Sequence, residues 1–354
     1  MTETTRDSGS ATSRPARVNA IGLAQADYKG LPTTLCQGCG HNSIANQIVQ
    51  VAYELSVRPQ DVLKLSGIGC SSKSPAYFLG QSFGFNSLHG RMPSLATGAL
   101  TANHHLTGIA VSGDGETASI GMGQFKHLMR RNVRMVYIIE NNGVYGLTKG
   151  QFSATADEGQ SLKYAGTNEF PAIDLCMEAI LAGCGFVARS FSGDSSQVRE
   201  LMKAALSHRG TAMLDIISPC VAFNNDDTST KSYGYGKEHE LPLHTIGFVP
   251  KEEEILIEDY DPGEMRVVEM HDGSYIKLRK LETDYDPTDR MGAMHRLLWA
   301  QEKQEFITGL IYLDESRASL AETARLAETP LAALEDGRIR PTREVLAGIM
   351  SGLM

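Results

Sequence analysis

The sequence predicts an α/β protein built on a doubly wound, mostly parallel sheet of six strands. First, short apolar segments alternate with segments whose apolar residues recur at helical spacing, which is the pattern of repeated strand–helix–strand units. Second, the residues capable of chemistry follow the apolar segments, which places them at the carboxyl ends of parallel strands, where open α/β sheets bind ligands. Third, a chain of 354 residues with 42% hydrophobic residues is long enough for one large domain with extensions.

Six short apolar runs define the expected strands, at residues 62–66, 85–88, 108–112, 133–139, 185–189 and 212–218. The segments between them supply the expected helices, at about residues 42–55, 94–105, 173–183 and 197–207, with one more between the third and fourth strands. In the first of these helices Ile44, Ile48, Val51 and Leu55 fall on one face, which is typical of a helix packed on a sheet.

The chain divides into three parts. Residues 1–20 are polar and predict a disordered leader, and residues 21–240 form the sheet domain. Residues 241–354 differ in character, because two alternating segments, one with an Asp-Gly turn, predict a β-ribbon. Residues 294–306 and 316–350 are expected to be helical, with breaks at Pro330 and Pro341. We expect this C-terminal β-ribbon and helical arm to contact a partner subunit.

Composition narrows the class of partner and the compartment. The net charge of −9 disfavours nucleic acid and anionic membranes as main partners. The N-terminal residues lack the apolar core of a secretion signal, so we expect a cytoplasmic protein. The six cysteines are then expected to be reduced thiols or metal ligands and not disulfides.

Two polar turns form the strongest motif. Asp114, between Gly113 and Gly115, and Asn142, in an Asn-Asn pair, lie 28 residues apart, the length of one strand–helix–strand unit. Both side chains therefore fall at the carboxyl ends of neighbouring parallel strands. A carboxylate and an amide oxygen suit Mg²⁺, and glycines allow a phosphate to approach the backbone.

Four cysteines are candidate metal ligands: Cys36, Cys39, Cys70 and Cys220. Four thiolates can hold Zn²⁺ or an iron–sulfur cluster, and the spacing alone does not decide between them. Only Cys36 and Cys39 form a local CxxC pair, whereas structural zinc sites usually use two pairs, and this favours a cluster. Cys176 and Cys184 lie in apolar stretches and are expected to be core residues.

The Gly-Asp-Gly and Asn-Asn turns together resemble the thiamine diphosphate signature. That resemblance implies a thiamine diphosphate-binding fold in which Mg²⁺ is bound by Asp114, Asn142 and the backbone oxygen of Val144. A longer series of motifs, in the same order over residues 30–240, resembles the β subunit of 2-oxoacid:ferredoxin oxidoreductases: CQGCGH, GIGCSS, HGRMPSLATG, GDGETASIG, NNGVYGLTKGQ and SPC. In that family, cysteines that match Cys36, Cys39, Cys70 and Cys220 bind one [4Fe–4S] cluster beside the cofactor.

Further residues in the turns at this edge of the sheet are candidate contacts for thiamine diphosphate: Gly69, Ser71, His89, Gly90, Arg91, Gly113, Gly115, Glu116, Leu147 and Thr148. Lys73 follows Cys70 closely and is a candidate partner for a substrate carboxylate or a coenzyme A phosphate. His41, at the start of the first expected helix, is given a supporting role near the cluster or the cofactor.

The implied activity is coenzyme A-dependent oxidative decarboxylation of a 2-oxoacid to acyl-CoA and CO₂, or the reverse, with electrons passing through the cluster to ferredoxin. The favoured substrate is 2-oxoglutarate, with pyruvate next. The glutamate that activates the cofactor lies on the α subunit in this family, so the chain is expected to act only in an αβ or (αβ)₂ assembly.

Two other functions remain open. One is a non-redox thiamine diphosphate decarboxylase or synthase whose cysteines hold zinc or no metal. The other is a non-catalytic assembly subunit, which the presence of Asp114, Asn142 and all four cysteines disfavours.

Overall fold

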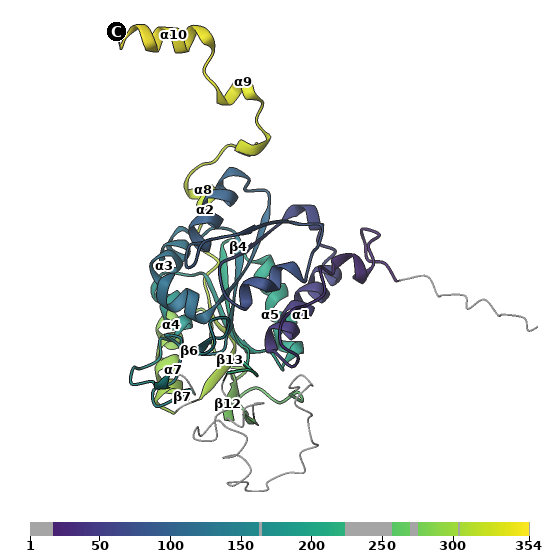
Figure 1. Cartoon of the computed structure of the whole chain (residues 1–354), viewed down its shortest axis with the longest axis vertical. Coiled ribbons are helices and arrows are strands. Elements are labelled where there is room, and N and C mark those ends of the chain that lie inside the picture. Colours follow the sequence, from purple (N-terminus) through teal and green to yellow (C-terminus); the bar gives the residue numbers. More distant parts are fainter. Residues whose placement is uncertain (1–16, 163–164, 224–256, 270–274, 304, 354) are drawn as a thin grey trace, which may run out of the picture.

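A nine-stranded sheet lies at the centre of the computed structural model, which describes residues 17–162, 165–223, 257–269, 275–303 and 305–353 (Figure 1). In space the strands follow the order β11-β12-β13-β9-β10-β4-β3-β1-β2. Most of the expected leader, residues 1–16, lies outside the described residues, as do residues 251–256 at the start of the expected ribbon.

Six neighbouring strands are parallel: β1 (Val62–Ser66), β2 (Phe83–Asn86), β3 (Thr107–Gly113), β4 (Met135–Asn141), β9 (Phe186–Phe191) and β10 (Thr211–Ile217). They confirm the six predicted strands, although β2 begins two residues earlier than expected. Every residue of β1, β9 and β10 is buried, because helices cover both faces of the sheet. Continuous apolar runs are therefore the correct signal for these strands.

The sheet has three further strands, so the predicted total of six is wrong. β13 (Phe306–Leu313) pairs antiparallel with β9, β12 (Tyr275–Lys280) pairs parallel with β13, and β11 (Met265–Glu269) pairs antiparallel with β12. The expected β-ribbon is thus present, and it extends the central sheet. Helix α7 ends at Glu302, before the apolar run that forms β13.

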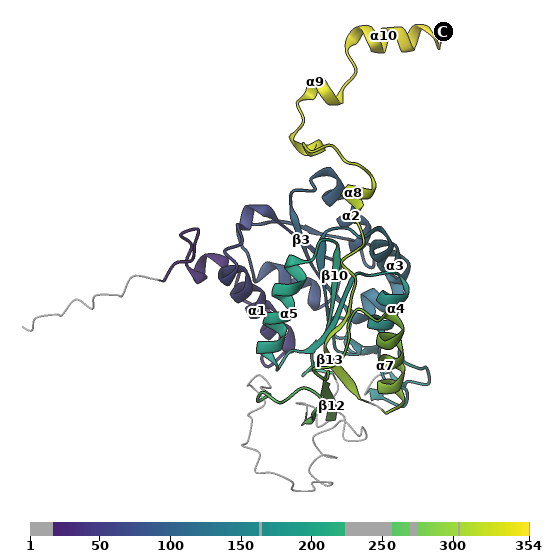
Figure 2. The same ribbon diagram turned by 180° about the vertical axis from the view of Figure 1, so that it is seen from behind.

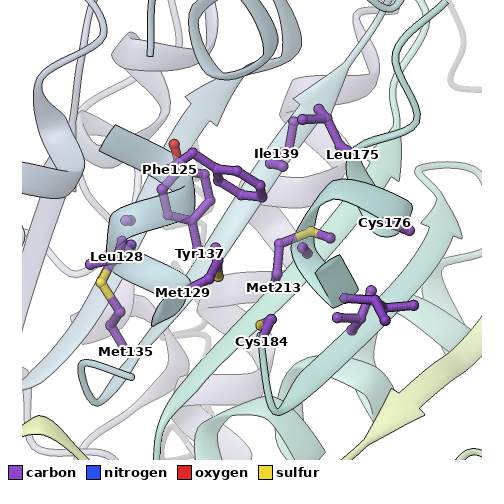
Figure 3. Packing of buried hydrophobic residues seen from close by; sticks show 14 of the residues in the cluster. Phe125, Leu128, Met129, Met135, Tyr137, Ile139, Leu175, Cys176, Cys184 and Met213 are labelled. Atoms are coloured by element: carbon purple, nitrogen blue, oxygen red, sulfur yellow. The ribbon is translucent and has the colours of Figure 1, made fainter. Parts of the chain in front are cut away.

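Helices cover the two faces of the sheet (Figures 1 and 2). On one face lie α1 (Gly40–Glu54) and α5 (Ser195–Ser207), whose apolar residues share a core with the sheet. The opposite face carries α2 (Met92–Ala102), α3 (Met122–Arg131), α4 (Leu175–Leu181) and α7 (Arg290–Glu302). Cys176 and Cys184 are fully buried in that second core, as expected (Figure 3).

The end of the chain leaves the sheet (Figure 1). Over the expected helical region 316–350 it forms short helices, α8 (Leu320–Thr323), η5 (Leu331–Ala333), α9 (Asp336–Ile339) and α10 (Arg343–Ser351), with interruptions at both expected breaks, Pro330 and Pro341. No residue of η5, α9 or α10 is buried. Of the helices that the structure describes, none is both long and apolar enough to cross a membrane.

Candidate functional site

A cavity of about 80 Å³ lies at the carboxyl edge of the parallel strands. It gathers thirteen of the residues that the sequence singled out: His41, Gly69, Cys70, Ser71, His89, Gly113, Asp114, Gly115, Glu116, Asn142, Val144, Leu147 and Thr148. Its lining also includes Ile68, Glu140, Tyr145 and Gly146. Lys73, Gly90, Arg91, Cys36, Cys39 and Cys220 are not among the residues that line it.

Asp114 is the central charged group of this cavity and is only 1% exposed. Its Oδ1 accepts a hydrogen bond from the backbone amide of Asn142 at 3.2 Å, and its Oδ2 accepts from the hydroxyls of Ser153 and, at 2.6 Å, Thr155. Burial raises the pKa of Asp114, and these hydrogen bonds oppose the rise. Among the described residues no lysine, arginine or histidine forms an ion pair with this carboxyl group.

A hairpin of β5 (Val144–Tyr145) and β6 (Gln151–Phe152) follows the Asn-Asn turn within the long polar loop. The Asn142 side-chain oxygen accepts from the Val144 amide at 3.1 Å, and the Tyr145 hydroxyl donates to the carbonyl of Gly115 at 2.7 Å. A Cβ at Gly115 would lie 2.7 Å from the Tyr145 ring, so glycine is required there for packing as well as for access to a ligand.

Glu116 connects the turns that follow β1 and β2. Its carboxylate accepts from the backbone amides of Gly90 at 2.8 Å and Ile68 at 3.2 Å, and the Nδ1 atom of His89 lies 3.8 Å away. A Cβ at Gly67 would overlap this carboxylate. The hydrogen bonds of Glu116 are therefore made with the protein itself, and they fix the shape of the cavity wall. Arg91, which precedes α2, is exposed and takes no part in these contacts.

Behind the Asn-Asn turn lies a buried chain of polar contacts. Asn141 donates to Asp215 at 2.9 Å and accepts from Thr155 at 3.2 Å, and Asp215 is paired with Arg189 at 2.9 Å. Since Thr155 also donates to Asp114, these contacts join an ion pair on β9 and β10 to the carboxylate in the cavity. The sequence analysis did not single out these residues, although two charges within apolar strands were a detectable signal.

The sulfurs of two of the four candidate cysteines, Cys70 and Cys220, lie close to Gly146 in the wall of the cavity. A Cβ at Gly146 would lie 3.4 Å from the Cys70 sulfur and 3.6 Å from the Cys220 sulfur. Burial, with the neighbouring thiols Cys70 and Cys36, raises the pKa of Cys220 to about 11. Burial is also the main cause of the raised pKa values of Cys39 and Cys70, and the nearby Cys36 thiol contributes to both increases.

The chemistry of these donor groups, though not their spacing in this structure, suits two absent groups. Asp114 is a buried carboxylate with oxygen-bearing neighbours, which is the environment that a hard cation neutralises. The thiols raise one another's pKa values, and a positively charged metal centre at their meeting point would reverse that effect. In the part of the chain that the structure describes, no group of three or more His, Cys, Asp or Glu side chains is gathered closely enough to hold a metal ion.

A larger cavity, about 520 Å³, lies at the opposite edge of the sheet. It is lined by segments that follow α2 and α5, including His104, His105, His208 and Arg209. Basic side chains are common at the carboxyl ends of helices, where they compensate the helix dipole. This larger cavity contains none of the residues that the sequence predicted for the cofactor site.

The fold is of the thiamine diphosphate-binding type: residues 67–216 match the family model for the C-terminal TPP-binding domain of thiamine pyrophosphate enzymes. A 2-oxoglutarate synthase subunit KorB of Methanocaldococcus jannaschii is 32% identical over 63% of this chain and 84% of its own length. The chain belongs to the family of 2-oxoacid:ferredoxin oxidoreductase β subunits.

Other relatives agree with this assignment. A 2-oxoacid:ferredoxin oxidoreductase subunit beta of a Sulfolobus species is 42% identical over 56% of this chain, and the 2-oxoglutarate oxidoreductase subunit KorB of Mycobacterium tuberculosis is 38% identical over 54%. The matches span 65% and 51% of the length of these two relatives. A solved 2-oxoglutarate:ferredoxin oxidoreductase from Magnetococcus marinus, with 2-oxoglutarate, coenzyme A and succinyl-CoA bound, covers 94% of this chain and 98% of its own chain, with 26% identity and a TM-score of 0.70.

Proposed function

We propose that this chain is the subunit of a coenzyme A-dependent 2-oxoglutarate:ferredoxin oxidoreductase that carries the Mg²⁺–diphosphate site and a [4Fe–4S] cluster. The observation that carries this proposal is the position of Gly146, which lines the cavity of Asp114 and Asn142 and where a Cβ would lie 3.4 Å from the Cys70 sulfur and 3.6 Å from the Cys220 sulfur. A cofactor site and a thiol cluster therefore share one wall. This arrangement suits a reaction that releases electrons directly beside an acceptor.

In this proposal the chain binds the cofactor and orients it. Asp114, Asn142 and the Val144 carbonyl would hold Mg²⁺, with the diphosphate along Gly113 and Gly115. When bound, thiamine diphosphate supplies an electron sink for decarboxylation of a 2-oxoacid, and an iron–sulfur cluster accepts single electrons. The Asp114 carboxylate is buried, and a bound cation would favour its charged form.

The proposed roles of the other residues in the cavity wall follow from their positions around the cavity. Ser71, Gly69, Leu147 and Thr148 would contact the cofactor from two sides. His89 would face it from the turn after β2, with Gly90 and Arg91 supporting that turn. Lys73, on η3 (Ser71–Ala76), would meet a substrate carboxylate or a coenzyme A phosphate outside the cavity.

The relatives support 2-oxoglutarate as the substrate, because two of them are KorB subunits and the solved neighbour contains 2-oxoglutarate, coenzyme A and succinyl-CoA. The partners in this proposal are an α subunit, which contributes the activating glutamate, and ferredoxin. The arm formed by residues 241–354 would contact the α subunit, and the enzyme would work in the cytoplasm.

Co-expression with the α subunit tests the proposal. The anaerobic complex is assayed with coenzyme A and a dye acceptor against 2-oxoglutarate, pyruvate and branched 2-oxoacids, and this chain alone is the control. We expect reduction of the dye that depends on coenzyme A and is fastest with 2-oxoglutarate. Fastest turnover of pyruvate would refute the assignment of 2-oxoglutarate as the substrate. Decarboxylation without dye reduction, in a protein that contains zinc, would support a non-redox enzyme.

A further inference from the structure

A buried polar cluster lies between the cavity and the cysteines, and consists of His41, Ser74, Glu140 and Ser218. Each of these side chains is at most 1% exposed. The Ser74 hydroxyl donates to both carboxylate oxygens of Glu140, at 2.9 and 3.0 Å. His41 Nδ1 lies 2.6 Å from the hydroxyl oxygen of Ser218 and 3.6 Å from Glu140.

Three members of this polar cluster lie close in sequence to cysteines that are predicted to bind the iron–sulfur cluster, each to a different cysteine. His41 follows Cys39 by two residues, Ser74 follows Cys70 by four, and Ser218 precedes Cys220 by two. The fourth member, Glu140, ends the buried part of β4 two residues before Asn142. The cluster thus joins the three separate segments that carry the cysteines to the strand that carries the Asn-Asn turn.

Glu140 is an unusual residue to bury at this place. Among the described residues it forms no ion pair with a lysine or arginine, and burial raises the pKa of its carboxyl group. A buried carboxyl group without a strong cation is unfavourable, so packing alone does not explain it.

The start of α1 is packed against the same strand ends. A Cβ at Gly40 would lie 2.6 Å from the Ser218 hydroxyl and 2.5 Å from that of Ser192, and Ser43 donates to the Ser192 carbonyl at 2.7 Å. The CxxC turn is therefore held on β9 and β10 at close range. This contact leaves little freedom for the Cys39 and Cys220 segments to move apart.

We propose that Glu140, with Ser74 and His41 as its partners, is a positioning residue that fixes the three cysteine segments around the iron–sulfur cluster. The carboxyl group accepts from the segment of Cys70 and contacts the segment of Cys39, and His41 carries the connection to the segment of Cys220. The inference rests on the proposed function, because it requires that the cysteines bind a cluster.

The experiment uses the complete αβ complex, purified anaerobically. Ser74→Ala removes one hydroxyl, Glu140→Leu removes the carboxyl group, and Glu140→Gln keeps an acceptor oxygen for Ser74. Tyr137→Phe is the matched control, because Tyr137 lies on the same strand, is 1% exposed and loses its buried hydroxyl contacts, with Thr117 at 3.1 Å and with Ser112. The measurements are iron per chain, the rate of iron release to a chelator, the EPR spectrum of the reduced complex, and the urea midpoint of unfolding.

We expect iron release to be about 10–100-fold faster in Ser74→Ala and Glu140→Leu, with an altered EPR spectrum. Glu140→Gln should restore most of the iron retention, and Tyr137→Phe should match the wild type even where its urea midpoint falls. Unchanged iron release and EPR spectrum in folded Ser74→Ala and Glu140→Leu would overturn the inference. A wild-type complex without iron would instead refute the proposed function, so the two failures are distinguishable.

Discussion

The backbone amide of Asn142 donates to Oδ1 of Asp114 at 3.2 Å, although 28 residues separate them in the sequence. The contact exists because β3 and β4 are parallel neighbours whose carboxyl ends coincide, with Gly113 opposite Glu140. The two halves of the cofactor motif therefore form one site before any ligand binds. This relationship is the basis for the first prediction.

Thr155→Val should weaken Mg²⁺-dependent retention of thiamine diphosphate by about 10–100-fold, since it removes a hydroxyl that orients the Asp114 carboxylate. The measurement is the Mg²⁺ concentration at which the αβ complex retains half of its cofactor. Thr101→Val is the control, because Thr101 donates only to the carbonyl of Thr97 within α2. Equal Mg²⁺ requirements in both variants would contradict the assigned role of Asp114.

Gly146→Ala should lower the iron content of the anaerobic complex, because the added methyl group would contact the sulfurs of Cys70 and Cys220. The backbone at Gly146 is not in the left-handed region, so the substitution should leave the fold intact. Gly123→Ala is the matched control, since a Cβ there would meet open space. If both variants carry the wild-type amount of iron, the cluster does not lie beside Gly146.

Gly90→Ala should lower the free energy of unfolding by at least about 1–2 kcal/mol, because Gly90 has a φ of +72° that other residues adopt at a cost. A Cβ there would also lie 2.8–2.9 Å from atoms of Ile120 and Gly121. Gly98→Ala, in the middle of α2 with open space around it, should instead add roughly 0.5–1 kcal/mol. Urea denaturation of both variants provides the comparison, and changes of the same sign would be inconsistent with the structure.

Arg189→Met should cost about 3–5 kcal/mol of folding free energy, since it leaves Asp215 buried without its partner. Arg189 also pairs with Asp174 at 2.9 Å, so the loss affects the start of α4 as well. Arg340→Met is the control, because its contact with Asp336 lies on the surface, and no measurable change is expected. A loss of folding free energy below about 1 kcal/mol for Arg189→Met would contradict this prediction, because it would show that Asp215 reaches solvent once Arg189 is removed.

Acidification should destabilise the chain through His208. Burial lowers its pKa below the ordinary value of 6.5; Glu315 and Asp314 oppose this shift, and Arg209 reinforces it. The unfolded chain then binds the proton more readily than the folded chain, so stability is lost as the pH falls below about 6.5. His208→Leu should flatten this part of the pH profile of unfolding, and His105→Leu, at an exposed position, should leave it unchanged. A profile that is equally steep without His208 would contradict this assignment.

Strand ends were the most reliable information in the sequence. Asp114 and Asn142 were placed correctly because continuous apolar runs of five to seven residues identify buried parallel strands, and their ends must share an edge. β13 was missed because a short apolar run such as FITGLIYL is compatible with either a strand or a buried helix. Only its pairing with β9 distinguishes the two.

The contacts between side chains were less predictable than the strands. Glu140 and Gly146 lie within the recognised motifs, but their roles depend on residues such as Ser74 and Cys220, which are remote in the sequence. No periodicity encodes such a contact. A carboxylate within the apolar run of β4 was the one visible sign that a buried polar partner exists.

The central claim is that this chain passes electrons from a 2-oxoacid to an iron–sulfur cluster held by Cys36, Cys39, Cys70 and Cys220. Low-temperature EPR of the anaerobic αβ complex, recorded before and after addition of 2-oxoglutarate and coenzyme A, tests it directly. We predict about four iron atoms per chain and a reduced-cluster signal that appears with both substrates and is lost in Cys70→Ser. Zinc in place of iron, or an iron signal that the substrates do not change, would contradict the account.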